Sequence, residues 1–300
     1  MRSDMEPIVL YCKSYKGDFL RAKRLASSIA KFNKDNIPFY MSVPEIDFQL
    51  FDEQLNEMAV TLIRDEQIIL MNPKHDLKQI NQMPGTLSQQ VVKSEFWRLG
   101  LCENYVCIDS DNEFIKDFYK SDFLTPNGQP YTVISEEKEL FEFCDRYHLK
   151  NVPINFQRDS TLVQELFERS GKMYSFGIPP LVWSRKVWMS LDEHLLNPSN
   201  LSFADLIIQY PYELRLYGEA LLKYRSIPLW PCGDIFKTYH YQSQYFYDIK
   251  RGITIDMLSK NYIGIVRQSN WEGEHFGIAK KSLPSRINKK IKRFIRWLSV

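Results

Sequence analysis

The chain has 300 residues, 44% of them hydrophobic and 25% charged, which are ordinary values for a globular protein. This composition excludes a disordered chain, a collagen-like chain and a coiled coil, and the length suits one large α/β domain with a sizeable core. The 39 Lys and Arg residues nearly balance the 37 Asp and Glu residues, and a net charge of +2 argues against nucleic acid as a partner.

The positive charge is concentrated at one end of the chain. Residues 280–300 contain eight basic side chains and no acidic one. Subtracting these eight charges from +2 leaves a net charge of −6 on residues 1–279. A mildly acidic body therefore ends in a strongly basic tail.

Cysteine spacing and hydropathy bear on the cellular compartment. The five cysteines are scattered without a CxxC pair, and several lie in apolar runs. This pattern favours buried thiols in a reducing cytoplasm over a disulfide framework or a zinc knuckle. The N-terminus has no apolar signal core, and no run approaches the roughly 20 apolar residues of a membrane helix.

The first 63 residues alternate between short apolar runs and stretches with helical spacing. Buried strands and amphipathic helices produce these two patterns. The predicted elements are, in order, a strand at 8–11, a helix at 19–33, a strand at 38–44, a helix at 48–57 and a strand at 60–63. This βαβαβ order predicts an α/β fold with a mostly parallel central sheet flanked by crossover helices.

The same patterns continue through the rest of the body. Thr86 and Gln89 resemble a capping box and predict a helix that starts at Thr86 and ends before Gly100. The further predicted elements are strands at 105–108 and 131–135, helices at 136–147 and 161–170, an extended segment at 179–184, a helix at 212–224 and an extended segment at 227–230. No repeat or linker divides the body.

Two acidic residues follow the predicted strand at 105–108 directly, in the order Asp109-Ser110-Asp111. The carboxyl ends of strands are where open α/β sheets bind ligands. Carboxylates this close repel one another unless a cation lies beside them. Mg²⁺ or Mn²⁺ bridging a diphosphate fits this donor set, whereas a pair of solvated turn acids is the simpler alternative.

The stretch from Leu87 to Asp111 resembles nucleotide-sugar glycosyltransferases of the GT-A fold, in particular a bacterial group that builds capsule and lipopolysaccharide. In that group a helix carrying Q-x-x-K, here Gln90 to Lys93, precedes the strand that delivers the D-x-D motif. The resemblance implies a GT-A domain over residues 1–281, with a nucleotide-binding half at 1–135 and an acceptor half at 136–281. It also implies metal-dependent transfer of a sugar, from a donor that we expect to be UDP-linked, to a surface glycan or lipid-linked acceptor.

The resemblance further implies roles for particular residues. Asp111 would coordinate Mn²⁺ or Mg²⁺, and Asp109 would coordinate the metal or the donor ribose. Lys93 can meet a phosphate as a point charge, and Tyr15 can stack on a base, although each could instead be a solvated surface residue. The full set of donor-binding candidates in this part of the chain is Cys12, Lys13, Ser14, Tyr15, Gln89, Gln90, Lys93, Asp109 and Ser110.

A late histidine extends the resemblance. Many GT-A enzymes carry one as a third metal ligand, with a glycine and a diphosphate-binding lysine behind it, and His275, Gly277 and Lys280 match that order with shorter spacing. An imidazole beside two carboxylates suits Mn²⁺ better than Mg²⁺. An exposed loop histidine is the alternative.

Glu213 is the candidate catalytic base, with Asp205 as a second choice. The same bacterial group often shows a glutamate followed four residues later by Tyr-Gly, which Glu213, Tyr217 and Gly218 match. An inverting transferase needs a carboxylate to accept the proton of the acceptor hydroxyl, whereas a retaining one needs no such base. An acid in the first turn of a helix is also favoured by the helix dipole alone.

Three other functions compete with this interpretation. A haloacid-dehalogenase phosphatase needs Thr or Val where this chain has Glu113. A sugar-phosphate nucleotidyltransferase needs a glycine-rich basic loop after the first strand, which is absent here. A non-catalytic peripheral-membrane protein of glycan assembly would leave Asp109 and Asp111 without a role.

The tail at 282–300 is predicted to form a basic amphipathic helix. Apolar residues recur on one stripe, and basic residues occupy most of the rest. We expect residues 285–300 to bind an anionic membrane surface, at the cytoplasmic face of the inner membrane, although docking on the body is an alternative.

Overall fold

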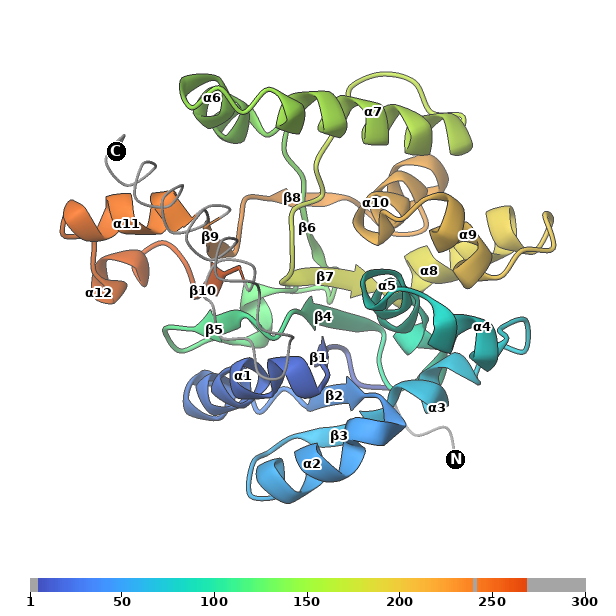
Figure 1. Ribbon diagram of the computed structural model, residues 1–300, viewed down its shortest axis with the longest axis horizontal. Coiled ribbons are helices and arrows are strands. Elements are labelled where there is room, and N and C mark those ends of the chain that lie inside the picture. The colour runs from blue at the N-terminus through green and yellow to red at the C-terminus, as the bar shows by residue number, and fades with distance from the viewer. Residues whose placement is uncertain (1–4, 240–241, 269–300) are drawn as a thin grey trace, which may run out of the picture.

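The computed structural model describes residues 5–239 and 242–268, which form a mixed α/β body around one five-stranded sheet (Figure 1). His275, Lys280 and the tail at 282–300 lie outside the described residues. The predicted metal, phosphate and membrane contacts of these residues therefore stay predictions.

The central sheet is parallel except at one edge. In spatial order its strands are β3 (Thr61–Arg64), β2 (Phe39–Val43), β1 (Val9–Lys13), β4 (Asn104–Ile108) and β7 (Leu181–Ser184). The first four run parallel, and β7 pairs antiparallel with β4. The inner strands are covered on both faces, which is why they read as continuous apolar runs. The predicted α/β class, with a mostly parallel sheet flanked by helices, is confirmed.

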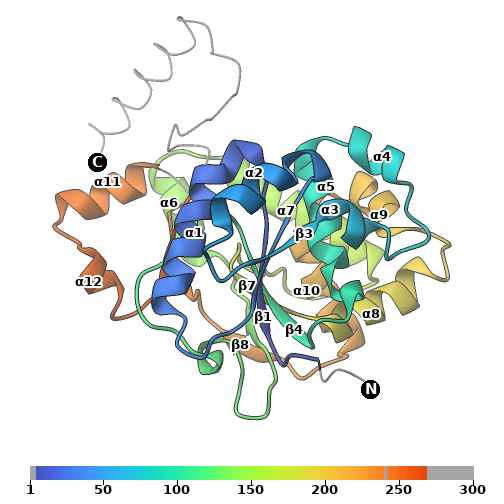
Figure 2. The ribbon, with the colours of Figure 1, turned by 90° about the horizontal axis from the view of Figure 1, so that it is seen from below.

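Alternate residues of the inner strands face two separate cores, as the two-residue period of a strand requires. Tyr11 and Tyr105 belong to one core, and Leu10 and Val106 to the other. The second core is covered by α1 (Phe19–Phe32) and α2 (Glu45–Leu55). The first is covered by α3 (Asp65–Ile69), α4 (Leu77–Gln82), α5 (Gly85–Glu95), α7 (Asn151–Leu166), α8 (Arg185–Leu191), α9 (Phe203–Gln209) and α10 (Glu213–Tyr224) (Figure 2).

Two smaller sheets complete the described part of the fold. In one, β10 (Gly264–Arg267) lies between β5 (Asn112–Phe114) and β9 (Phe236–Tyr239), antiparallel to β5 and parallel to β9. In the other, β6 (Tyr131–Val133) runs parallel to β8 (Trp230–Cys232). The remaining helices are α6 (Lys138–Arg146), α11 (Gln242–Lys250) and α12 (Ile255–Leu258). Because β5 begins directly after Asp111, its pairing with β10 holds the backbone that follows Asp109 and Asp111 in place.

Most of the predicted elements are confirmed, with ends shifted by a few residues. The bounds of the helix predicted at 161–170 are wrong, because α7 (Asn151–Leu166) begins ten residues earlier, with Pro153 in its first turn, where a proline is tolerated. The predicted helix start at Thr86 is wrong, because α5 begins at Gly85 behind Pro84, which supplies no side-chain cap. The main-chain oxygen of Thr86 instead accepts a hydrogen bond from Gln90 one turn later. Gly100 ends the following 3-10 turn with a φ of 68°, as predicted for a helix stop.

Two further expectations concern the cysteines and membrane-spanning helices. All five cysteines are free thiols, four of them buried, as their apolar neighbours predicted. Within residues 5–239 and 242–268, no helix has both the length and the apolar character that crossing a membrane requires.

Candidate functional site

The polar side chains predicted at the first strand and at the D-x-D motif lie along one edge of the central sheet. Lys13 ends β1, Asp65 follows β3 and Asp109 follows β4. Because these strands are parallel, their carboxyl ends meet at the same edge. The helix α5 runs along this edge and carries Lys93.

Lys93 and Asp109 form the central ion pair of the site. Lys93 Nζ lies 2.5 Å from Asp109 Oδ1, and the two side chains are 3% and 36% exposed. Burial opposes the charge of Lys93, but the Asp109 carboxylate more than offsets this and raises the lysine pKa above its usual value. The Tyr105 hydroxyl donates to the Lys93 carbonyl at 3.0 Å, so one strand positions both partners. The lysine is therefore a fixed, permanently charged ammonium at the sheet edge.

Glu213 belongs to the same electrostatic cluster. It is the first residue of α10 and half-buried. Burial raises the pKa of Glu213, Asp109 raises it further, and Lys93 lowers it. The structure thus brings together an ammonium and two carboxylates, Lys93, Asp109 and Glu213, that the sequence assigned to separate tasks.

Gln90 connects the helices that carry these groups. Its Nε2 donates to the Thr86 carbonyl at 2.9 Å, and its Oε1 accepts from the Glu213 backbone N–H at 3.3 Å. Both ends of the amide are thus used within the protein. Gln90, predicted to lie near the nucleotide, holds the start of α10 against α5.

We expect Gln90→Ala to lower the free energy of unfolding by about 1–2 kcal/mol, because the substitution removes both of these hydrogen bonds. The neighbouring Gln89→Ala should change it by less than about 0.5 kcal/mol, since Gln89 is half-exposed on a different side of α5. Urea denaturation of the two variants measures the difference. Equal stability of both variants would contradict the bridging role.

A pocket of about 550 Å³ opens at the carboxyl ends of β1 and β3, against α5. Lys13 and Asp65 line it, with Nζ and Oδ2 3.2 Å apart and both side chains almost fully buried. Burial raises the pKa of Asp65, and Lys13 opposes that shift. Gly85 and Ser88 of α5 line the opposite side. We call this cavity the strand-end pocket.

The other first-strand candidates differ in accessibility. Cys12 is fully buried in the second core. Ser14 is 1% exposed, and its hydroxyl has no hydrogen-bond partner in the described part of the structure. Tyr15 is 42% exposed and lies close to the Lys13 ammonium, 5.8 Å from Nζ to the ring centroid. Of these three side chains, only that of Tyr15 is exposed enough to contact an incoming base.

Gly17 allows this position of Tyr15. A Cβ atom at residue 17 would lie 2.4 Å from Cε2 of the tyrosine ring. Any side chain there would push the ring away from the backbone. Gly17 is therefore part of the site, because only a residue without a side chain leaves room for the Tyr15 ring.

The D-x-D motif supplies oxygen ligands for a cation, but the described residues complete no metal site. Asp111 is half-exposed, and its main-chain oxygen accepts from the Arg267 N–H at 3.2 Å, while Ser110 is buried. Among residues 5–239 and 242–268, no three His, Cys, Asp or Glu side chains are arranged to hold a metal ion.

The motif nevertheless fits a hard divalent cation. One oxygen of Asp109 is paired with Lys93, while the side chain remains partly open to solvent next to Asp111. Two carboxylates, completed by diphosphate oxygens and water, match the preference of Mg²⁺ and Mn²⁺. His275, the predicted third ligand, lies outside the described residues.

Asp205 lies apart from the Lys93 cluster. Its carboxylate caps the amino end of α9, accepting from the Ser202 backbone N–H at 2.9 Å and from the Ser202 hydroxyl at 2.7 Å. These bonds with Ser202 lower the Asp205 pKa. The capping contacts give the residue a structural role in α9.

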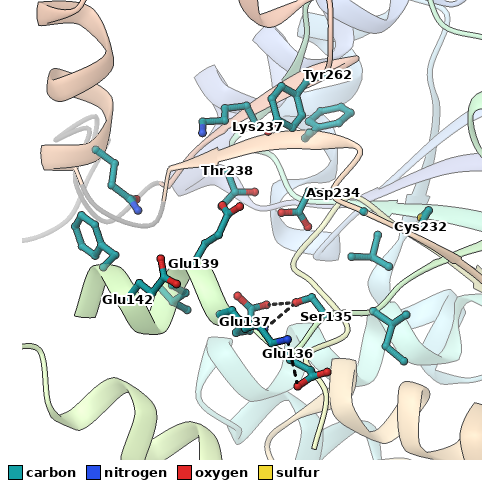
Figure 3. A pocket seen from close by; sticks show the side chains of 18 of the residues that line it. Ser135, Glu136, Glu137, Glu139, Glu142, Cys232, Asp234, Lys237, Thr238 and Tyr262 are labelled. Atoms are coloured by element: carbon teal, nitrogen blue, oxygen red, sulfur yellow. Dashed lines mark hydrogen bonds and ion pairs between the residues drawn. The ribbon is translucent and has the colours of Figure 1, made fainter. Parts of the chain in front are cut away.

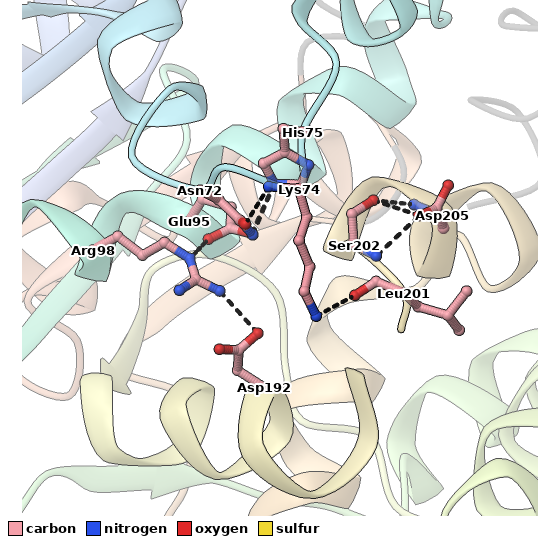
Figure 4. A network of polar contacts seen from close by, with 9 residues as sticks. All are labelled: Asn72, Lys74, His75, Glu95, Arg98, Asp192, Leu201, Ser202 and Asp205. Atoms are coloured by element: carbon pink, nitrogen blue, oxygen red, sulfur yellow. Dashed lines mark hydrogen bonds and ion pairs between the residues drawn. The ribbon is translucent and has the colours of Figure 1, made fainter. Parts of the chain in front are cut away.

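Asp205 lies near a buried polar network that the sequence did not reveal (Figure 4). His75 Nε2 lies 2.8 Å from Glu95 Oε1, and Glu95 also pairs with Arg98, which reaches Asp192 at 2.9 Å. Burial opposes ionisation of Glu95, but His75 and Arg98 bring its pKa below the usual value. The network joins α5 to the loop before α4 and to Asp192 at the end of α8, and is structural.

A second, larger cavity of about 800 Å³ lies between α6 and β9 (Figure 3). Its lining is rich in carboxylates, which include Glu137, Glu139 and Asp234. Burial and the two glutamates raise the pKa of Asp234, while Lys237 lowers it. We call this cavity the acidic pocket. It lies in the half of the chain that the resemblance assigns to the acceptor.

Three comparisons with known proteins complement this geometry. No curated protein matches the sequence. Among solved structures, the chain is similar to the apo crystal structure of mouse xyloside xylosyltransferase 1, with a TM-score of 0.49 and 8% identity, over 88% of this chain and 98% of that one. Residues 6–245 match the profile of DUF6492, a family of unknown function. Since that match covers most of the chain, the protein belongs to the DUF6492 family.

Proposed function

We propose that the protein is a metal-dependent glycosyltransferase that moves a sugar from a nucleotide-sugar donor to a glycan or lipid-linked acceptor. The observation that carries the proposal is the cluster of Lys93, Glu213 and Asp109, the last of which lies two residues before Asp111 in the chain, together with the strand-end pocket that Lys13 and Asp65 line at the same edge of the sheet. An ammonium, a cation-binding motif and a carboxylate with a raised pKa are the groups that inverting sugar transfer from a diphosphate can use.

In this proposal the strand-end pocket receives the nucleoside. Tyr15 stacks on the base, while Lys13 and Asp65 offer a donor and an acceptor of hydrogen bonds at the pocket wall. The buried pair is preorganised, because neither side chain has to leave water when the ligand binds. We expect the nucleotide to be UDP, as the resemblance implies.

Lys93 and Glu213 act at the opposite ends of the reacting bond. The Lys93 ammonium offsets negative charge on the departing diphosphate as the bond from the anomeric carbon to the diphosphate oxygen breaks. Glu213 accepts the proton of the acceptor hydroxyl as its oxygen bonds to that carbon. A divalent cation on Asp111 and Asp109, when bound, supplies further positive charge to the leaving group.

The acidic pocket is the proposed place of the acceptor. Its carboxylates can accept hydrogen bonds from sugar hydroxyls, and Tyr262 lines it beside them. We infer a bacterial surface glycan or its lipid-linked precursor as the acceptor. The enzyme would then work at the cytoplasmic face of the membrane, where residues 285–300 could hold it.

Nucleotide binding and turnover test the proposal. With Mn²⁺ present, we expect one member of a panel of nucleotide sugars to bind in calorimetry and to release a nucleoside diphosphate. Asp65→Asn should weaken that binding about tenfold, because it removes a charge from the pocket wall but keeps the side-chain shape. Asp52→Asn, an exposed position on α2, is the matched control and should bind as the unmodified protein does.

The substrates and products separate this function from its rivals. A nucleotidyltransferase would leave the nucleotide sugars intact and would release pyrophosphate only from a nucleoside triphosphate supplied with a sugar phosphate. A phosphatase would release inorganic phosphate from a sugar phosphate and no nucleoside diphosphate from the panel. Absence of both nucleotide binding and turnover across the panel would refute the proposal.

A further inference from the structure

The α11–α12 segment carries exposed apolar side chains that the described body leaves uncovered. Five large ones are open to solvent within residues 246–257, and they are Phe246, Tyr247, Ile249, Ile255 and Met257. In both ribbon views the two helices lie at the periphery, beyond the central sheet (Figures 1 and 2). Within α11, Phe246 and Ile249 lie three residues apart, so their exposure is not the scattered exposure of single apolar residues and is typical of an interaction surface.

The inner side of α11 is attached to the body. Tyr245 packs edge-on against Tyr239 of β9, with ring centroids 5.4 Å apart, and Asp248 accepts a hydrogen bond from the Tyr239 hydroxyl at 2.9 Å. Phe246 and Ile249 are three residues apart and therefore share a helix face, which adjoins the one that holds Tyr245 and Asp248 because Ile249 is one turn after Tyr245. They are 37% and 49% exposed. The helix is thus fixed by one face and presents an apolar face next to it.

Basic residues border this apolar face. Lys250, which is four residues after Phe246, Arg251 and Lys260 are all exposed. Arg251 donates to the Tyr247 hydroxyl at 2.9 Å, which places a guanidinium beside an exposed aromatic ring. Aromatic and aliphatic side chains bordered by Lys and Arg are the composition that the interface of an anionic bilayer favours.

We propose that the outer face of α11–α12, centred on Phe246 and Ile249, enters the headgroup region of an anionic lipid surface. This contact is distinct from the one expected of the tail, and it does not depend on catalytic activity. Apolar burial gives the face affinity for any bilayer, and Lys250 and Arg251 make it favour negatively charged lipid. The partner is a lipid surface rather than a second copy of the chain, because the exposed cations Lys250, Arg251 and Lys260 outnumber the acids Asp248 and Asp256 of the same segment and complement anionic headgroups.

Vesicle flotation of the full chain tests this inference. Phe246→Ser combined with Ile249→Ser should lower binding to phosphatidylcholine vesicles that contain about one third phosphatidylglycerol by about tenfold. Ile154→Ser combined with Leu162→Ser is the matched control, because these two α7 residues are equally apolar and exposed but lie on another element. It should leave binding unchanged. Lys250→Glu with Arg251→Glu should weaken binding to the phosphatidylglycerol vesicles and not to pure phosphatidylcholine.

A tail variant separates the two lipid contacts. The full chain with Lys289, Lys290, Lys292 and Arg293 replaced by Ala should bind more weakly but remain sensitive to the Phe246 and Ile249 substitutions. Unchanged binding of the Phe246→Ser, Ile249→Ser variant would overturn the proposal. The proposal would also be overturned if the unmodified chain self-associated in the absence of vesicles and the Phe246→Ser, Ile249→Ser variant lost this self-association but bound lipid equally well.

Discussion

Replacing Asp111 with Ala is expected to lower sugar transfer by at least about 10³-fold while leaving the fold intact, because the substitution removes an oxygen ligand of the leaving-group cation. The main-chain oxygen of Asp111, which accepts from the Arg267 N–H, is retained in the variant. Initial rates with the donor found in the nucleotide screen measure the loss. Calorimetric titration with Mn²⁺ alone should show weaker binding in the same variant.

A nearby acid provides the control for Asp111. Asp117 follows β5, is half-exposed and pairs with Lys34 at 3.2 Å on the surface. Asp117→Ala removes the same charge from the same stretch of chain and should change transfer less than about twofold, because surface pairs contribute little. Near-normal transfer by the Asp111→Ala protein would refute the cation assignment.

Replacing Glu213 with Gln is expected to lower transfer by about 10²–10³-fold and to leave the melting temperature unchanged or higher. Burial raises the folded-state pKa of Glu213 above its usual value. A raised carboxyl pKa gives stability that is present below the unfolded-state pKa and is lost as the pH rises through the folded-state pKa. The glutamate loses that contribution once it is ionised, whereas the uncharged amide of the Gln variant carries no penalty for a buried charge.

The pH dependence of transfer provides a second measurement on Glu213. A base must be ionised, so transfer should fall on the acid side of the profile at a pH above the usual glutamate pKa. That acid limb should disappear from the residual activity of the Gln variant. Lys93→Met should move the limb to higher pH in an enzyme that keeps Glu213, because the ammonium lowers the Glu213 pKa.

Asp205→Asn is the matched comparison for the base. It should cost about 1 kcal/mol of stability through the weakened α9 cap and leave transfer unchanged. The opposite result, with transfer lost in Asp205→Asn and kept in Glu213→Gln, would exchange the two assignments.

The βαβαβ start of the chain and the D-x-D position could be predicted because both depend on local patterns. Strands covered on both faces read as apolar runs, and acids directly after such a run must lie at the strand end. The same rule would have found Asp65, which follows the strand at 61–64, had the predicted strand not ended one residue early. The structural role of Asp205 was also readable, since Ser202 and Asp205 have the spacing of a capping box.

Other features depend on tertiary contacts that no local pattern shows. The sequence gives no sign that Gln90 bonds the start of α10, because that contact joins residues 123 positions apart. In the sequence, His75 and Glu95 look like two ordinary surface residues. They become a buried pair only because α5 packs on the loop before α4. The α11–α12 helices were missed because their apolar residues point outward, so the pattern of a core-facing helix is absent.

The antiparallel strand β7 has a consequence for how the chain acquires its fold during synthesis. It covers the outer edge of β4, yet it lies far beyond the nucleotide-binding half predicted at 1–135. Until Ser184 has emerged from the ribosome, β4 remains a bare sheet edge, with unpaired backbone groups that invite association with other chains. A fragment that stops near residue 135 would carry the D-x-D motif on that exposed edge. The motif is therefore stably presented only after β7 has joined the sheet.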